Sequence, residues 1–237
     1  KGVITTHRAL LGCAEQFQKA LQVEPHGEYL SYVPLSWITE QWVGVMVGMM
    51  LPLRVNFAER PDQVQEAIRE LAVGVLFLGS RQWENLAAGV HTRMIDAGPL
   101  RQAMVKWGLG IGRAVHVARI EGRSPPRWPR LLLPVAEALV LAPLRDQLGL
   151  KRVRIAMTGG AATAPDVVRL FAAMGVRMRN IYGCSEYGLV SAHVGDSYDP
   201  ESVGTPCVDA THMAGPLEYR ITGEGELQLR AGLGFAG

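Results

Sequence analysis

Residues 152–183 read RVRIAMTGGAATAPDVVRLFAAMGVRMRNIYG, and this stretch decides the fold class. Residues 152–157 are predicted to form a strand, and residues 164–174 an amphipathic helix with proline in its first turn and glycine just past its end. Residues 176–181 are predicted to form a second strand. Strand, helix and strand in this order make a βαβ unit, so we expect the two strands to be parallel and joined by a right-handed crossover.

A glycine-bearing loop follows each of these strands. Residues 158–163 (TGGAAT) follow the first strand, and Tyr182-Gly183 follow the second. The carboxyl ends of parallel strands meet at one edge of a sheet, where open α/β sheets bind their ligands. Two loops of small residues at this edge are suited to hold a planar base and its phosphate.

The preceding sequence extends the same architecture. Short apolar runs at residues 29–33, 54–57 and 73–78 are predicted strands, and helical periodicity predominates between them. Three prolines make residues 123–129 a predicted loop. We therefore expect an α/β core over residues 1–190, with a layered, mostly parallel sheet flanked by helices.

The pattern changes after residue 191, where helical periodicity fades. Alternating runs at residues 217–222 and 225–230 flank Gly223-Glu224-Gly225, a hairpin turn signal. We expect residues 191–237 to begin a small antiparallel, β-barrel-like subdomain.

The composition excludes several classes of protein. Of the 237 residues, 48% are hydrophobic and 19% charged, which indicates a globular chain. The net charge of +2 comes with scattered basic residues, so nucleic acid is not an expected partner. Three widely spaced cysteines favour neither a disulfide framework nor a zinc site, and they indicate a reducing cytoplasm.

Five segments, in this order and spacing, resemble the acyl-adenylate-forming superfamily of acyl-CoA synthetases, adenylation domains and luciferases. They are similar to the end of its phosphate loop, its GGA-type adenine loop, its YGxTE motif, its SVGxP turn and its GELxLRG strand. In the last of these, Ala231 stands in place of the final glycine. The segments are residues 1–7 (KGVITTH), 158–162 (TGGAA), 180–186 (NIYGCSE), 201–206 (ESVGTP) and 225–230 (GELQLR).

Two further segments resemble the long-chain fatty acyl-CoA synthetases within this superfamily. Residues 33–40 (VPLSWITE) are similar to their LPL-x-(H/W)-x-x-E segment. Residues 78–84 (LGSRQWE) look like their P-x-x-W-E block, with Ser80 in place of proline. The long insert over residues 83–144 also fits this subfamily.

The resemblance implies an AMP-forming acid–thiol ligase. ATP and a carboxylic acid, favoured to be a long-chain fatty acid, would give acyl-AMP and pyrophosphate, and CoA would then take the acyl group as a thioester. Magnesium bridging the phosphates would neutralise their charge. A lipid substrate is compatible with peripheral contact at the inner membrane. Acyl chain length, oligomeric state and the choice between CoA and a carrier-protein thiol stay open.

The resemblance also implies a nucleotide site. Gly160, Ala161 and Ala162 would line the adenine, and Tyr182 would stack on it. Asn180 belongs to the same motif and is assigned to the same site.

The groups predicted to take part in the reaction, Ser185 and Glu186, come shortly after Tyr182 in the sequence. Glu186 matches the glutamate of the superfamily that is associated with magnesium. Ser185 replaces the usual threonine and keeps the hydroxyl that contacts the α-phosphate. Both are predicted to be catalytic.

The acyl pocket is implied less directly by the resemblance. Gly183 would let the acyl carboxylate approach closely. Trp37 stands where relatives carry a histidine or an aromatic residue that gates the acyl tunnel. Trp83 and Gly204 are further candidates for the pocket.

Two alternatives are open. A serine hydrolase would need G-x-S-x-G around Ser185, and Tyr187 occupies the position of the second glycine. A non-catalytic module that binds nucleotide or acyl chain is the other alternative. Lys1-Gly2-Val3 reads as the interior of a longer chain, so we expect a fragment of the N-terminal adenylation domain that is inactive by itself. His7 and His193 are expected to be structural.

Overall fold

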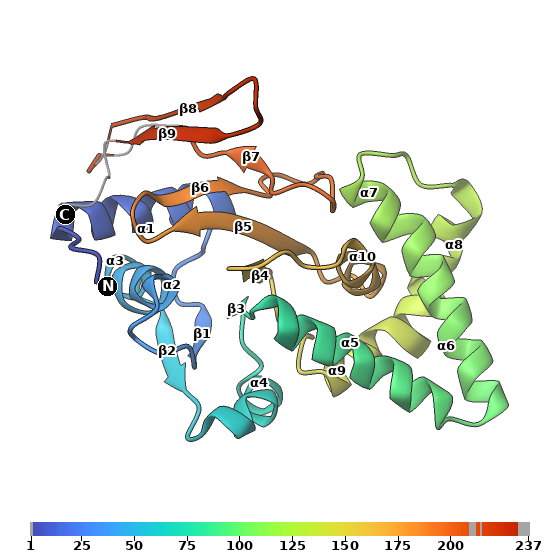
Figure 1. Cartoon of the computed structure of the whole chain (residues 1–237). Helices are drawn as coiled ribbons and strands as arrows, with labels where there is room; N and C mark the ends of the chain where they lie inside the picture. Colours follow the sequence, from blue (N-terminus) through green and yellow to red (C-terminus); the bar gives the residue numbers. More distant parts are fainter. Residues whose placement is uncertain (1, 209–211, 214, 232–237) are drawn as a thin grey trace.

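A parallel sheet with an antiparallel edge forms the centre of the protein (Figure 1). The computed structural model describes residues 2–208, 212–213 and 215–231, and Lys1 of the predicted phosphate-loop segment lies outside them. Within this part, seven strands pair in the order β2-β1-β3-β4-β5-β6-β7. The parallel strands are β1 (Glu28–Ser31), β2 (Arg54–Phe57), β3 (Val75–Phe77), β4 (Ile155–Gly159) and β5 (Met178–Cys184), and the antiparallel ones are β6 (Gly188–Ala192) and β7 (Thr205–Pro206).

Helices cover both faces of this sheet and extend beyond it on one side (Figure 1). One face carries α1 (His7–Leu21), α2 (Ile38–Glu40), a π-helical segment (Gln41–Val47) and α3 (Gly48–Met50). The other carries a 3-10 turn (Pro61–Gln63), α4 (Val64–Leu71), α5 (Ser80–Ile95) and α10 (Pro165–Ala173). The outer helices are α6 (Pro99–Gly112), α7 (Ala118–Ile120), α8 (Arg127–Ala136) and α9 (Ala142–Gln147), with π-helical segments at Arg113–Val117 and Glu137–Leu141.

Two apolar cores lie on opposite sides of the sheet. Along β3, Val75 and Phe77 belong to the core under α1, whereas Leu76 belongs to the core under α5 and α10. This alternation follows from the period of two of a strand. Because both faces of the sheet are covered at its centre, the central strand β3 (VLF) is entirely apolar and β4 (IAMTG) is fully buried. The predicted layered α/β fold is confirmed.

The βαβ unit that decides the fold is also confirmed. β4 and β5 pair in parallel, with Ala156 opposite Met178 and Gly159 opposite Ile181. Gly175 ends α10 with a φ of +83°, a conformation that glycine adopts without a Cβ clash.

The prediction that Tyr182-Gly183 form a loop is wrong. Both residues belong to β5, because β6 turns back and pairs antiparallel along them, with Tyr182 opposite Ser191. The register shifts between Tyr182 and Gly183, so a bulge marks the point where a loop was expected.

The predicted loop over residues 123–129 is too long. α8 already begins at Arg127, with Pro126 at its N-cap and Pro129 in its first turn. The first turn of a helix needs no partner for its backbone N–H groups, so proline is tolerated there.

The predicted hairpin is present as a second, separate sheet. β8 (Leu217–Ile221) pairs antiparallel with β9 (Leu227–Ala231) across the glycine-rich turn. The predicted boundary between residues 190 and 191 falls within β6, and the main sheet continues past it to Pro206.

Gly204 provides a test of how closely the turn before β7 packs on β6. Its φ is +89°, and a Cβ there would lie 2.2 Å from the backbone carbonyl of Ala192. We expect Gly204→Ala to lower the free energy of unfolding by roughly 3 kcal/mol or more, because strain and a backbone clash add. Gly160→Ala is the matched control, since its φ of +82° is similar but nothing lies within 4 Å of an added Cβ.

Gly160→Ala should lower the free energy of unfolding only by the strain of a positive φ, about 1 kcal/mol. Urea denaturation of the two variants measures the difference. Equal losses would show that the turn relaxes away from β6.

Candidate active site

A cavity of about 340 Å³ lies at the carboxyl ends of β4 and β5. The segment that leads into α2 and the following π-helical segment close it from the other side. Five of the predicted site residues line the cavity together: Trp37, Gly160, Tyr182, Gly183 and Ser185. They come from three separate segments of the chain, so the fold brings the predicted nucleotide and acyl residues to one place.

The other lining residues were not predicted. Trp42 and Phe77 sit in apolar runs that read as ordinary core, and only the topology shows that they reach the cavity. Cys184 lies inside the YGCSE motif, where its position beside Ser185 was the available signal. The complete unpredicted set is Ser36, Ile38, Thr39, Trp42, Phe77, Gly159, Ile181, Cys184 and Leu189.

Ser80 holds the TGGAAT loop in place. Its hydroxyl donates to the carbonyl of Ala161 (2.9 Å) and accepts from the Thr163 hydroxyl (2.9 Å). The Thr163 oxygen also lies 2.8 Å from the hydroxyl of Thr158, the last residue but one of β4. This chain of hydroxyls leaves Ala161 and Ala162 exposed at the loop surface, and neither lines the cavity. The serine that departs from the family pattern therefore has a structural function.

Trp83 lies in the core and does not line this cavity. Its ring packs edge-on against Phe171, with centroids 4.8 Å apart, and its indole N–H donates to the carbonyl of Met157 (3.0 Å). Trp83 thus supports β4 just before the TGGAAT loop.

Gly159 and Gly183 are required by the protein's own backbone. A Cβ on Gly159 would lie 2.8 Å from the carbonyl oxygen of Ile181, and one on Gly183 would lie 2.4 Å from the carbonyl oxygen of Gly188. Strand contacts therefore exclude larger residues at both positions, whatever ligand the cavity takes.

Glu186 follows Ser185 and contacts Cys184 rather than lining the cavity. Burial raises the pKa of the Cys184 thiol, and backbone N–H groups oppose this while the Glu186 carboxylate adds to it. The thiol therefore stays protonated at neutral pH. Among the residues described, no group of three or more acidic, histidine or cysteine side chains could hold a metal ion.

Asn180 and Gly204 lie behind the cavity, around a buried histidine. His193 Nδ1 accepts from the Asn180 backbone N–H (3.1 Å), so its Nε2 is assigned as the donor to the Ser202 carbonyl (3.0 Å). The ring stacks on Tyr198, with centroids 4.3 Å apart. Burial lowers the pKa of His193. The expectation of a structural histidine is confirmed, because both nitrogens are satisfied in the neutral form.

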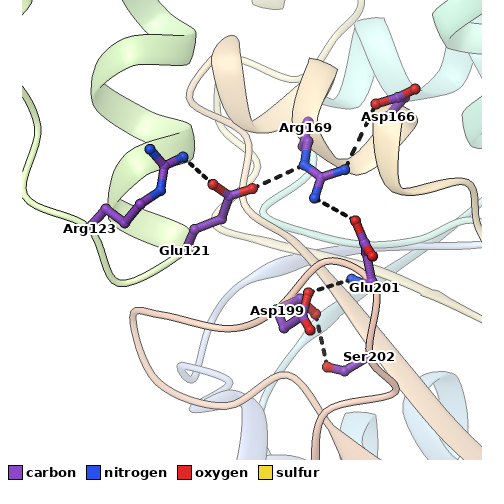
Figure 2. Close-up of polar contacts among 7 residues, drawn as sticks. All are labelled: Glu121, Arg123, Asp166, Arg169, Asp199, Glu201 and Ser202. Carbon is purple, nitrogen blue, oxygen red and sulfur yellow. Dashed lines mark hydrogen bonds and ion pairs between the residues drawn. The ribbon is translucent and has the colours of Figure 1, made fainter.

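Ion pairs hold the turn that carries Ser202 and Gly204 (Figure 2). The Arg169 guanidinium, on α10, lies between Glu121 (3.0 Å) and Glu201 (2.8 Å). Arg123 pairs with the same Glu121, and these two cations lower the pKa of its carboxyl. The turn after His193 is thereby tied to α10 and to the end of α7.

Glu40 lies buried behind the segment that carries Trp37. Its carboxyl accepts from the Tyr29 hydroxyl (2.9 Å), and burial raises its pKa. A Cβ on Gly44 would lie 2.0 Å from Glu40 Oε1, so glycine makes room for this carboxyl in the π-helical segment. The acidic end of the VPLSWITE segment thus has a structural function.

Comparison with known proteins identifies a family. The sequence model of the AMP-binding enzymes matches residues 1–228. The chain is 26% identical over 199 residues to the long-chain-fatty-acid–CoA ligase ACSBG2 of Mus musculus, covering 78% of this chain and 28% of that protein. It is 24% identical over 213 residues to the long-chain-fatty-acid–CoA ligase heimdall of Drosophila melanogaster, covering 88% of this chain and 31% of that protein. The chain spans about a third or less of the length of such relatives.

Solved structures share the fold. A malonyl-CoA ligase in a ternary product complex with methylmalonyl-CoA and AMP superposes with a TM-score of 0.64 at 17% identity, covering 100% of this chain and 41% of that one. The N-terminal domain of FACL13 from Mycobacterium tuberculosis superposes with a TM-score of 0.59 at 14% identity, covering 100% of this chain and 48% of that one.

The buried histidine predicts a pH dependence of stability. The pKa of His193 is lowered in the folded protein, so as the pH falls the imidazole takes up a proton more readily in the unfolded chain than in the folded one. The free energy of unfolding should therefore rise from about pH 5 to about pH 7, with a slope from this group of at most about 1.4 kcal/mol per pH unit. We expect His193→Gln to flatten this slope in thermal unfolding at several pH values.

The exposed His91 provides the control. His91→Gln should leave the slope unchanged. Burial also lowers the pKa of His116, so part of the slope persists in the His193 variant. A slope equal to that of the wild type after His193→Gln would contradict the assignment of a neutral, buried imidazole.

Proposed function

The chain belongs to the AMP-binding enzyme family, and we propose that the protein it forms part of activates a carboxylic acid with ATP and passes the acyl group to CoA. One observation carries this proposal. The TGGAAT loop, the YGCSE strand end and Trp37 surround a single cavity at the carboxyl edge of the sheet. This arrangement gives a nucleotide and an acid a common site, as adenylation requires.

In this proposal the backbone at Gly160 lets the adenine base approach closely, and the side chains of Tyr182 and Ser185 orient the base and the α-phosphate. Gly160 presents exposed backbone with a φ of +82° at the cavity, where a base can lie without meeting a side chain. Tyr182 offers an exposed ring for stacking. The Ser185 hydroxyl donates to the α-phosphate, whose charge grows as the carboxylate attacks.

Glu186 is the residue proposed to hold magnesium. Magnesium is commonly bound by one or two protein carboxylates together with substrate phosphates and water, so a single glutamate beside Ser185 fits an ion that arrives with ATP. The ion would neutralise phosphate charge.

A fatty acid is the proposed substrate class. Its support comes from the relatives that are long-chain-fatty-acid–CoA ligases and from the apolar side of the cavity, formed by Trp42, Phe77, Ile181 and Leu189. The serine hydrolase alternative gains no support, because the hydrogen bonds of the described residues include none between Ser185 and a histidine.

Exchange of pyrophosphate into ATP tests the function directly. We expect the full-length protein to catalyse exchange with one class of acid from a panel of short, medium and long fatty acids and aryl acids, because adenylation is reversible. A long-chain preference would support the proposed substrate class. No exchange with any acid from a folded protein would rule out the ligase function and leave a binding protein that has lost its chemistry.

The role of Glu186 predicts a selective defect. In the full-length protein Glu186→Gln should reduce exchange by about 100-fold or more, as removal of a group that stabilises transition-state charge does, while thermal unfolding is unchanged. The exposed Glu59 offers the matched control, and Glu59→Gln should keep full exchange. Wild-type exchange in the Glu186 variant would remove the magnesium role from this residue.

A further inference from the structure

The outer helices α6 and α8 carry apolar side chains that no part of the described chain covers. They pack against each other at the edge of the protein away from the antiparallel strands (Figure 1). On α8 and its continuation, Trp128 is 77% exposed, Leu131 69% and Leu139 57%. We call the exposed apolar residues of these helices the α6/α8 face: Leu100, Met104, Trp107, Trp128, Leu131, Leu132, Val135 and Leu139.

The spacing of these residues makes each helix amphipathic. Positions 100, 104 and 107 on α6 are separated by four and three residues. Along α8 and the π-helical segment, position 128 is followed by the pair 131 and 132, then by 135 and 139, which also keeps them on one side of the helix. Each set therefore forms a stripe along one side of its helix. On each helix the opposite, inward side carries other residues, such as Val105 and Leu133, which pack against Val140 and Leu141. The exposed stripes are additional to the core.

The part of the chain that carries these helices, residues 99–136, has a large excess of positive charge. Residues 99–136 contain seven basic residues (Arg101, Lys106, Arg113, Arg119, Arg123, Arg127 and Arg130) and one acidic residue, Glu121. The segment therefore carries a formal charge of +6, and the rest of the chain carries −4, because the total is +2. Glu121 is already occupied by Arg123 and Arg169.

The other six cations have no acidic partner within the described residues. The ion pairs found there involve none of them, although other arginines of the protein are paired. Four of them, Arg101, Lys106, Arg127 and Arg130, lie on α6 and α8 with the exposed tryptophan and leucine residues. Uncompensated cations on amphipathic helices of this kind are typical of helices that lie in the interface of a membrane with anionic lipid.

Charge also decides between a membrane and a second copy of this chain. Two such faces in contact would bring the four unpaired cations of α6 and α8 in one copy against those of the other, and these charges repel. An anionic lipid surface attracts each basic residue and accepts the apolar stripes into its interfacial layer at the same time. No helix in the described part of the chain is long and apolar enough to cross a membrane.

We propose that the α6/α8 face docks on the surface of an anionic lipid bilayer, with Trp128 and Leu131 inserted and Arg127 and Arg130 at the phosphate level. The inference does not rest on the proposed ligase chemistry. For an enzyme that acts on a fatty acid, such docking would bring the site to the phase in which the substrate is concentrated.

Vesicle sedimentation of the full-length protein tests the proposal. Vesicles of phosphatidylcholine alone are compared with vesicles that contain roughly 30% phosphatidylglycerol, and binding to the anionic vesicles should be tighter and should weaken with added salt. The double variant Trp128→Ser/Leu131→Ser should lose at least about tenfold in affinity. In the double variant Arg127→Gln/Arg130→Gln, the affinity for anionic vesicles should fall about fivefold for each charge removed.

Two controls match these variants. Phe57→Ser removes an apolar side chain that is 71% exposed on the edge strand β2, and Arg152→Gln removes an exposed cation outside the segment. Both should bind vesicles as the wild type does. All the substituted side chains are exposed, and thermal unfolding checks that each variant is folded.

Three outcomes would overturn the proposal: equal binding of the wild type to both kinds of vesicle, unchanged binding of the α6/α8 variants, or a change in oligomeric state without a change in vesicle binding. The last would identify the face as an interface between copies. Pyrophosphate exchange with a water-soluble acid is measured on the same samples. Exchange without vesicle binding would refute the docking alone, and vesicle binding without exchange would refute the ligase function alone.

Discussion

The parallel pairing of β4 with β5 is the constraint on which the candidate site depends. Because the two strands run in the same direction, the loop after β4 and the end of β5 meet at one edge of the sheet. The pairing is close enough that Gly159 has no room for a Cβ beside Ile181. Residues predicted for the nucleotide and for the acid therefore line one cavity because of the way these two strands pair.

The antiparallel return of β6 is the second determinant. It extends β5 through Tyr182 and Gly183, and it brings His193 beneath the site, where the ring joins Asn180 to the Ser202 turn. The Arg169 ion pairs tie that turn to α10 (Figure 2). Asn180, His193 and the Ser202 carbonyl thus satisfy one another's polar groups behind the cavity, which ties β5 to the Ser202 turn.

Local patterns predicted most of the fold. The βαβ unit, the parallel strands and the β8–β9 hairpin follow from periodicity and turn residues that act over a few positions. The errors occur where distant pairing overrides a local signal. Tyr182-Gly183 have the composition of a loop and become strand because β6 supplies hydrogen-bond partners from further along the chain.

The family was predictable from the sequence, because the glycine loops and the YGCSE segment are short, contiguous patterns. Which residues line a common cavity was not predictable, because it depends on how distant segments pack. In the structure Trp37 and Ser185 line the same cavity, together with Trp42 and Phe77 from apolar runs. Trp83, which was predicted for the acyl pocket, is buried in the core instead. An apolar side chain has the same appearance in a sequence whether it faces a ligand or the core, and packing alone separates the two.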